Sequence, residues 1–282
     1  MQKLERLPTG IPNLDDILQG GVPRGGVFIV QGQPGAGKTI FGNQVCFHHV
    51  AGGGRALYIT LLAESHARML THIGQLSFFD EGAIPGKLYY ISAFRTLEDE
   101  GLKGLLTLLR REMRAHDADL MVLDGLVAVE ESAGSAREFK KFIHDLQSQA
   151  SMADCTIFLL TGVADYAASP EHTMVDGVIE FQSRLYGRRA ERELQIRKLR
   201  GGGFLRGQHS FHISDAGIAV YPRLEAYLAR PSQPDERLDT AIASGIAVLD
   251  EMAGGGLPKG SATIIVGPSG IGKTTLGLHF LG

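Results

Sequence analysis

The sequence predicts an α/β fold with a central, mostly parallel β-sheet flanked by helices and with late antiparallel strands. Three observations lead to this prediction. Short apolar or β-branched runs alternate with longer amphipathic segments, which is typical of a parallel sheet covered by helices. A glycine-rich motif of the form G-x-x-x-x-G-K-S/T follows the first of these runs. The motif occurs again 235 residues later, since 273 − 38 = 235, and its flanking residues repeat with it.

Strands and helices alternate along the chain, and each is expected from a local pattern. Leucines recur at helical spacing over 97–115, for example at Leu102 and Leu105, which predicts a long amphipathic helix. Runs such as 120–124 are apolar and short, which favours buried strands. In order, we expect a strand over 27–31, a helix from about 37, a strand over 55–61, a helix over 64–76, a strand over 87–92, a helix over 97–115, a strand over 120–124, a helix over 135–152, a strand over 155–161, and later strands over 177–182, 192–198 and 208–213.

The repeat also predicts the domain organisation. We expect one complete nucleotide-binding domain over 1–230 and the N-terminal part of a second, incomplete one over 240–282. Between them, residues 231–239 contain Pro231, Pro234 and several polar side chains, a composition that is typical of a linker.

Composition narrows the classes of partner. The chain has 282 residues, a formal net charge of −3 and a pI near 6.4, so it lacks the basic character of a nucleic-acid-binding protein. The first residues lack the apolar core of a signal peptide, and the apolar runs are too short to span a bilayer. Cys46 and Cys155 lie in apolar surroundings, which favours buried thiols in a reducing compartment. We therefore expect a cytoplasmic protein that does not enter membranes.

The first motif, residues 32–39 and called the first loop below, has the chemistry of a phosphate site. Its glycines let the backbone curl so that successive N–H groups point toward an anion. Lys38 can reach the β- and γ-phosphates of ATP, and Thr39 is placed to bind Mg²⁺ through its hydroxyl. The residues expected to hold the nucleotide are Gly32, Pro34, Gly35, Ala36, Gly37, Lys38, Thr39 and Ile40.

The second motif, residues 267–274 and called the second loop, predicts the same chemistry. Its expected nucleotide-binding residues are Gly267, Gly270, Gly272, Lys273, Thr274 and Thr275.

Two carboxylates complete the predicted catalytic set. Asp124 ends the apolar run over 120–124, where a carboxylate can bind the Mg²⁺ ion together with Thr39. Glu64 follows the strand expected next after the loop helix, which places it at the carboxyl edge of the sheet, where the nucleotide lies. We expect Glu64 to activate the attacking water.

Taken together, these motifs resemble the KaiC-like branch of the RecA-type P-loop ATPases. The resemblance lies in residues 7–15, 20–25, the first loop, the stretch over 193–201 with its K-x-R-G pattern, and the closing stretch over 217–224. It implies a RecA-like fold, tandem domains and a hexameric ring with ATP bound between subunits. It also implies that Lys198 and Arg200 contact the γ-phosphate of a neighbouring subunit, and we expect both on one face of a strand.

The chain departs from the pattern of that family in one catalytic feature. The family usually has two adjacent glutamates after the second strand, whereas this chain has Ala63 before Glu64. The leading hypothesis is an oligomeric, Mg²⁺-dependent ATPase that regulates a protein partner through its nucleotide state. Alternatives are a serine/threonine autokinase acting through the second domain, a nucleotide-dependent scaffold without hydrolysis, and a DNA-acting relative that uses the basic stretch over 184–192.

Overall fold

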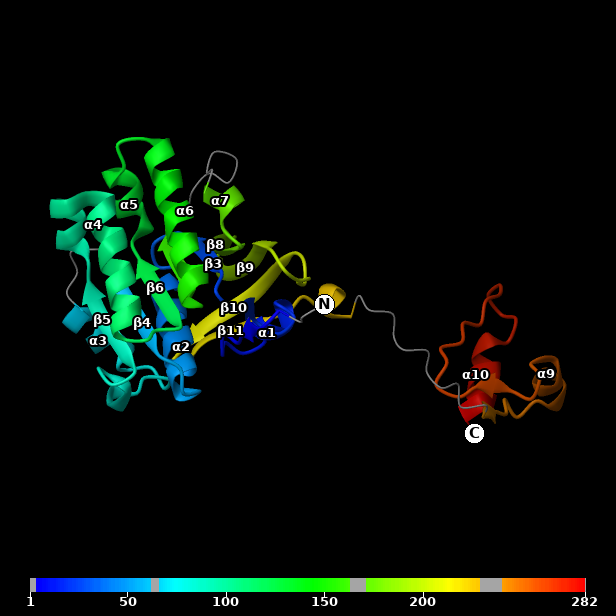
Figure 1. Ribbon diagram of the computed structural model, residues 1–282. Helices are drawn as coiled ribbons and strands as arrows, with labels where there is room; N and C mark the ends of the chain where they lie inside the picture. The colour runs from blue at the N-terminus through cyan, green and yellow to red at the C-terminus, as the bar shows by residue number, and fades with distance from the viewer. Residues whose placement is uncertain (1–3, 62–65, 163–170, 229–239, 282) are drawn as a thin grey trace. The chain divides into compact units, whose positions relative to one another are not determined.

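The computed structural model describes residues 4–61, 66–162, 171–228 and 240–281. Within the chain, two compact units are found, Met1–Tyr227 and Leu228–Gly282, and each is described by itself. Figure 1 labels many of the elements of both.

Nine strands of the first unit form one sheet. They are β3 (Val27–Gly32), β4 (Ala56–Thr60), β5 (Leu88–Ser92), β6 (Leu120–Asp124), β7 (Thr156–Thr161), β8 (Gly177–Tyr186), β9 (Arg189–Leu199), β10 (Gln208–Ser214) and β11 (Gly217–Tyr221). Their order in the sheet is β11-β10-β9-β8-β3-β7-β6-β4-β5. The neighbouring pairs β8–β3, β3–β7, β7–β6, β6–β4 and β4–β5 are parallel. The pairs β8–β9, β9–β10 and β10–β11 are antiparallel. This confirms the predicted mostly parallel sheet with late antiparallel strands.

Helices cover both faces of this sheet. They are α1 (Leu14–Ile17), α2 (Lys38–Ala51), α3 (His66–Ile73), α4 (Phe94–Ala115), α5 (Leu126–Ser132), α6 (Ala136–Ala153), α7 (Glu171–Met174) and α8 (Leu224–Tyr227), with the short strands β1 (Arg6–Leu7) and β2 (Val22–Pro23) and a 3₁₀ turn over Glu81–Ala83. Figure 1 shows α4, α5 and α6 gathered in one layer. Among the described residues, no helix combines the length and the apolar character that a membrane span requires.

The side chains of strand β3 alternate between the two hydrophobic cores, one on each face of the sheet. Phe28 and Val30 belong to the core beneath α2, whereas Val27 and Ile29 belong to the core beneath α4, α5 and α6. All four side chains are fully buried. Side chains alternate between the two faces of a strand, so a continuous apolar run is what a strand covered on both sides needs.

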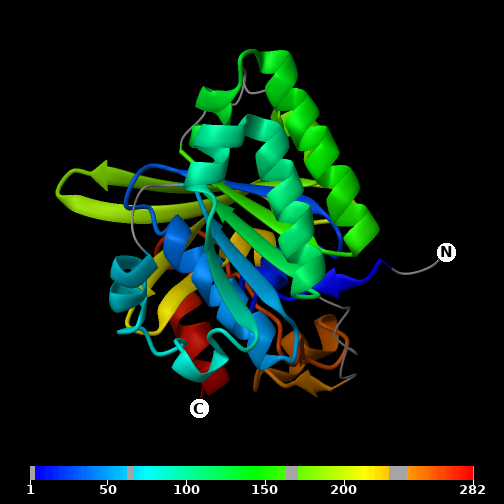
Figure 2. The same ribbon diagram turned by 60° about the vertical axis from the view of Figure 1, so that its left-hand side comes forward.

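Several boundaries differ from the expected ones. Helix α4 begins at Phe94 rather than 97, and it contains a break at Gly101, whose φ is 64°. The strands β8 and β9 are longer than expected and form a hairpin that projects from the sheet in Figure 2. Their outer halves are polar and exposed, so they carry little of the apolar signal on which the prediction relied. The elements α5 and β11 were not expected as a helix and a strand.

The second unit repeats the opening of the first. Its elements are β12 (Ala241–Ile242), α9 (Ala247–Met252), β13 (Leu257–Pro258) and α10 (Lys273–Leu281). Adding 235 to each residue of the β1–β2 pairing gives the β12–β13 pairing without a shift. A side-chain contact repeats as well, because Asp15 accepts a hydrogen bond from the N–H of Thr9 and Asp250 accepts one from that of Ser244.

Candidate nucleotide-binding site

The first loop connects β3 to α2 at the carboxyl edge of the parallel strands. Gly35 and Gly37 have φ values of 77° and 103°, in the left-handed region that disfavours other residues. A Cβ atom at Gly32 would lie 2.7 Å from the carbonyl oxygen of Phe181 on the neighbouring β8, so this position is also limited to glycine. Of the other predicted loop residues, Pro34 is exposed, Ala36 is buried and Ile40 packs against the core.

Lys38 closes the loop on itself. Its Nζ donates to the carbonyl oxygens of Gly32 at 2.7 Å and Gln33 at 3.0 Å. Burial lowers the pKa of this ammonium group, while the charge of Asp124 acts in the opposite direction. The hydrogen bonds of this ammonium group thus go to two neutral carbonyls, which the oxygens of a phosphate can replace.

Thr39 and Asp124 meet across the site, although 85 residues separate them in the chain. The Thr39 hydroxyl donates to Oδ2 of Asp124 at 3.1 Å, and the Tyr58 hydroxyl donates to the same oxygen at 2.9 Å. Asp124 is 8% exposed. Burial and the nearby Asp124 charge raise the pKa of Tyr58, which keeps it a neutral donor. A hydroxyl and a carboxylate are oxygen ligands of the kind that Mg²⁺ prefers.

Further polar side chains support these two residues, and the sequence interpretation missed them. Asn43, one turn after Thr39, donates to the Thr39 carbonyl at 2.8 Å and accepts from the Tyr90 hydroxyl at 2.7 Å. The rings of Tyr58 and Tyr90 lie 5.4 Å apart. In the sequence, Asn43, Tyr58 and Tyr90 belong to no motif and look like ordinary core positions of a helix and two strands. The sequence does contain one signal: an asparagine stands four residues after the loop threonine, which places both on the same face of the helix that follows the loop.

The predicted water-activating residue, Glu64, lies outside the described residues. Just after it, His66 begins α3, and its Nε2 lies 2.7 Å from Oγ1 of Thr60 at the end of β4. Thr60 is paired in register with Asp124. Burial lowers the pKa of His66. The end of β4 is therefore polar at the edge where the first loop lies.

Lys198 and Arg200 share a target, but not for the expected reason. Strand β9 ends at Leu199, so Arg200 lies in the turn beyond it rather than on the same strand. Both head groups nevertheless bind the Thr173 carbonyl, each at 2.8 Å. Burial, and then the charge of Arg200, lower the pKa of Lys198. Within one chain, the two cations stabilise the end of α7, whose carbonyls carry partial negative charge.

The second loop has the same internal contacts as the first. Nζ of Lys273 donates to the carbonyl oxygens of Gly267 at 2.8 Å and Pro268 at 2.6 Å. Gly270 and Gly272 have φ values of 84° and 96°. Thr274 and Thr275 are exposed, and in the part of the chain that the structure describes the Thr274 hydroxyl has no carboxylate partner. The second loop thus has the same lysine contacts as the first, without a carboxylate beside its threonine among the described residues.

Comparisons with known proteins identify the family and the fold class of the chain. A protein-family model described as "ATPase: KaiC" matches residues 7–225 and 242–282. The fold of a KaiC-like protein from Pyrococcus horikoshii OT3 superposes with a TM-score of 0.68, at 23% identity, over 78% of this chain and 100% of that one. The similarity confirms the predicted RecA-like fold class.

Curated relatives span nearly the whole chain. A circadian clock oscillator protein KaiC from Acaryochloris marina is 28% identical over 99% of this chain and 55% of its own length. A circadian clock oscillator protein KaiC 1 from Synechocystis is 29% identical over the same shares. The chain therefore spans about half the length of these relatives. With the family model matched on both units, the chain belongs to the KaiC ATPase family.

Proposed function

We propose that this protein binds ATP with Mg²⁺ at the first loop and hydrolyses it, and that the nucleotide state controls the binding of a protein partner. One observation carries the proposal: the Thr39 hydroxyl lies 3.1 Å from the Asp124 carboxylate, and the preceding residue, Lys38, holds its ammonium group against the carbonyls of the same loop. Membership of an ATPase family supports nucleotide binding at this place.

Each residue has a physical role in this proposal. Lys38 exchanges its loop carbonyls for the β- and γ-phosphates, a charge-assisted contact that is stronger than the one it replaces. Thr39 and Asp124 would hold Mg²⁺, which when bound neutralises charge on the phosphates. Among the described residues no cluster of three or more His, Cys, Asp or Glu side chains can hold a metal ion. That fits Mg²⁺ sites that use one or two protein groups together with phosphate and water.

The water is proposed to be activated by Glu64, with Lys198 and Arg200 acting on the nucleotide of a neighbouring subunit in a ring. The Arg200 side chain is 54% exposed, so its guanidinium group is accessible to a second chain. A neighbour's γ-phosphate would compete with the α7 carbonyls for both cations. The charge that develops on the phosphates in the transition state favours the phosphate over a neutral carbonyl.

For the second unit we propose a more limited role. Residues 1–230 would form a complete ATPase domain, 231–239 a linker, and 240–282 the beginning of a second domain of the same kind. The second loop binds phosphate groups weakly by itself, because it lacks an acidic partner for a metal ion among the described residues. We propose no kinase activity, since no described side chain favours it.

The proposal is tested by following light scattering and phosphate release in one sample, with and without ATP and Mg²⁺. We expect assembly with ATP and release of phosphate that depends on Mg²⁺. The Glu64→Gln variant should retain ATP and release phosphate roughly 10²-fold more slowly. ATP binding without any phosphate release in the wild-type protein would instead identify a scaffold that does not hydrolyse ATP.

A mixing experiment tests whether the site is shared between subunits. Arg200→Ala subunits keep their own first loop, and Lys38→Ala subunits keep their own Arg200. If Arg200 acts on a neighbour, mixing the two inactive variants restores part of the activity. If the mixture stays inactive while both variants assemble, Arg200 does not act in trans.

A further inference from the structure

The second half of α4 presents a row of cations to solvent. After the break at Gly101, Lys103, Arg110 and Arg114 lie at helical spacing on one side, and all three are exposed. The chain as a whole carries a net charge of −3, so this concentration of positive charge is local. Arg110 and Arg114 lie one turn apart, and like charges at this spacing repel each other.

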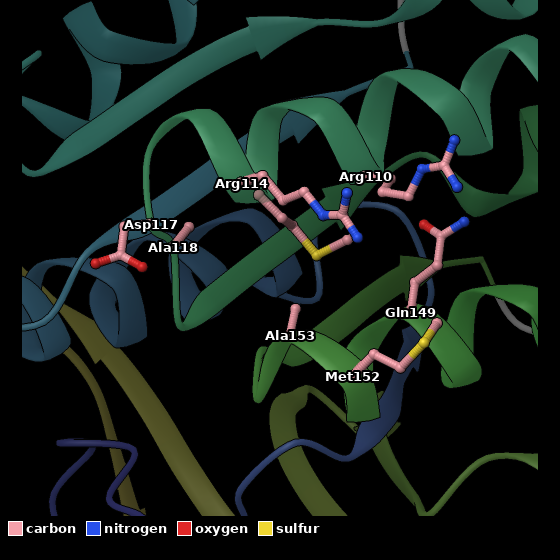
Figure 3. Close-up of a pocket in the computed structure, with 8 residues that line it drawn as sticks. Arg110, Arg114, Asp117, Ala118, Gln149, Met152 and Ala153 are labelled. Carbon is pink, nitrogen blue, oxygen red and sulfur yellow. The ribbon is translucent and has the colours of Figure 1, made fainter.

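A hollow of about 270 Å³ lies beside these two arginines, between the ends of α4 and α6. Figure 3 shows the side chains around it. We call it the arginine hollow. Its lining includes Arg110, Arg114, Met113, Gln149, Met152 and Asp117. In Figure 3 the Arg110 and Gln149 head groups lie together at one end, and the Asp117 carboxylate lies at the opposite end, beyond Arg114.

The two arginines have no acidic partner among the described residues. Their neighbour Arg111 differs, because its guanidinium group pairs with Glu112 at 2.7 Å. Other arginines of the first unit are also paired, such as Arg24 with Asp119 at 3.0 Å. Since two adjacent unpaired guanidinium groups repel each other, an incoming carboxylate would remove an unfavourable interaction and form charge-assisted hydrogen bonds.

The hollow also offers an apolar surface and a hydrogen-bond acceptor. Met113 is buried at its base, while Met152 is 76% exposed at its rim. The Oε1 atom of Gln149 is buried and has no hydrogen-bond partner in the described structure. Methionine side chains adapt to apolar partners, and a buried amide oxygen needs an N–H donor. A single ligand would need acidic, apolar and N–H groups close together.

We propose that the arginine hollow is a docking site for an acidic segment of a partner protein. A glutamate or aspartate carboxylate would bind Arg110 and Arg114, an adjacent apolar side chain would pack on Met113 and Met152, and a backbone N–H would donate to Gln149. Nucleic acid fits less well, because a phosphate backbone has no apolar side chain to pack on Met113 and Met152.

The position of the hollow makes it independent of the nucleotide site. Helices α4 and α6 begin near the carboxyl ends of β5 and β6, and both end at the opposite edge of the sheet. The arginine hollow lies at those far ends, whereas the first loop lies at the carboxyl edge. Docking at the arginine hollow therefore does not require ATP hydrolysis at the first loop.

The test uses the full chain and a short fluorescein-labelled peptide of alternating glutamate and leucine, measured by fluorescence anisotropy. We expect saturable binding that is weakened at least about tenfold in the Arg110→Gln/Arg114→Gln double variant. The matched control is Lys140→Gln, which removes an exposed cation of α6 that does not line the hollow, and it should change affinity less than about twofold. Thermal unfolding of each variant verifies that the fold is intact.

A second variant separates docking in the hollow from general attraction between charges. Met152→Ala should weaken the binding of the glutamate–leucine peptide and leave the binding of a glutamate–serine peptide unchanged. The proposal would be overturned if the double variant and Lys140→Gln lost peptide affinity equally. It would also be overturned if the peptide did not bind the wild-type protein. Tighter binding of a DNA duplex than of the peptide that depends on Arg110 and Arg114 would overturn it as well.

Discussion

The two phosphate loops have the same internal structure in very different surroundings. In each, a lysine ammonium group donates to two carbonyls of its own loop, at 2.7 and 3.0 Å in the first and at 2.8 and 2.6 Å in the second. Around the first loop, Ile29 and Val30 of β3 are fully buried. Their counterparts in the repeat, Ile264 and Ile265, are 85% and 45% exposed.

This difference separates local from long-range determinants of the site. The loop closes in both units, so its conformation follows from the glycines and the lysine of the motif itself. The strand before it forms only where β7 and β8 pair with it. Residues 262–267 have no such partners among the described residues and form no strand. The carboxylate that pairs with the Thr39 hydroxyl likewise comes from a distant strand, through Asp124.

The largest expected effect is on nucleotide binding. Lys38→Ala removes the ammonium group that would bind two phosphates, and charge-assisted contacts of this kind contribute about 1.5–3 kcal/mol each. We expect ATP affinity at the first loop to fall by about 10²-fold or more. Lys273→Ala removes the same group from the second loop, whose threonine has no carboxylate partner among the described residues, and total ATP binding should change little. Isothermal titration with ATP and Mg²⁺ measures both.

Lys38→Arg is the control for charge, because it keeps a cation but not the compact ammonium geometry. If Lys273→Ala lowers ATP binding as much as Lys38→Ala, the two loops are equivalent and Asp124 is not needed for affinity.

The next effect is on stability. Ile29→Ala removes a fully buried side chain from the centre of the sheet, and such cavities typically destabilise by about 2–5 kcal/mol. The matched change Ile264→Ala acts on an exposed side chain, and it should change the free energy of unfolding by less than about 0.5 kcal/mol. Urea denaturation followed by circular dichroism gives both values. Equal destabilisation would mean that residues 262–267 are buried in solution, against the described exposure.

Much of the fold was predictable because its signals are local. The strand over 120–124 and the loop motif follow from apolar runs and glycine spacing, and both occur where expected. The sequence did not indicate α5, a short helix after Asp124, or the outer parts of β8 and β9, which are polar. Those elements depend on neighbours that a single stretch of sequence does not contain.

The site was predictable in part for the same reason. Lys38, Thr39 and Asp124 belong to motifs, and the structure brings them together. Tyr58 and Asn43 belong to no motif, and only the folded arrangement shows that they hold Asp124 and Thr39 in place. The prediction that Lys198 and Arg200 lie on one face of a strand was wrong, because β9 ends at Leu199, one residue before Arg200. The pairing of β9 with β8 also shifts register between Val178 and Ile179.

A smaller effect is expected at the repeated turn that precedes each loop. Asp15 accepts hydrogen bonds from the Thr9 N–H at 2.9 Å and the Thr9 hydroxyl at 2.8 Å. Asp15→Ala leaves these partly buried donors unpaired, which should cost about 1–3 kcal/mol. The counterpart Asp250→Ala should leave the main unfolding transition unchanged, since Asp250 lies in the other unit. Thermal unfolding compares the two, and a shift with Asp250→Ala alone would reverse the expected order.

The smallest effect concerns the edge of the sheet opposite the first loop, where Asp119 holds Arg24 at 3.0 Å and the His49 ring at 2.7 Å. The residue that corresponds to Arg24 in the second unit, Lys259, has no acidic partner among the described residues. Burial alone would raise the pKa of Asp119, but the hydrogen bonds from His49 and from the Arg55 N–H outweigh it and lower this pKa to about 2.

Because the folded state lowers the pKa of Asp119, the stabilisation that its charge provides is present above the ordinary value of about 4 and is lost as pH falls toward about 2. The group is partly exposed, so solvent screening limits the contribution to about 1 kcal/mol or less. Asp119→Asn should therefore lower the unfolding midpoint at pH 7, and the difference from the wild-type protein should vanish near pH 2. Asp99→Asn, at an exposed position of α4, is the charge-matched control. A deficit in Asp119→Asn that stays constant between pH 7 and the acid limit would show that Asp119 acts through packing rather than through its charge.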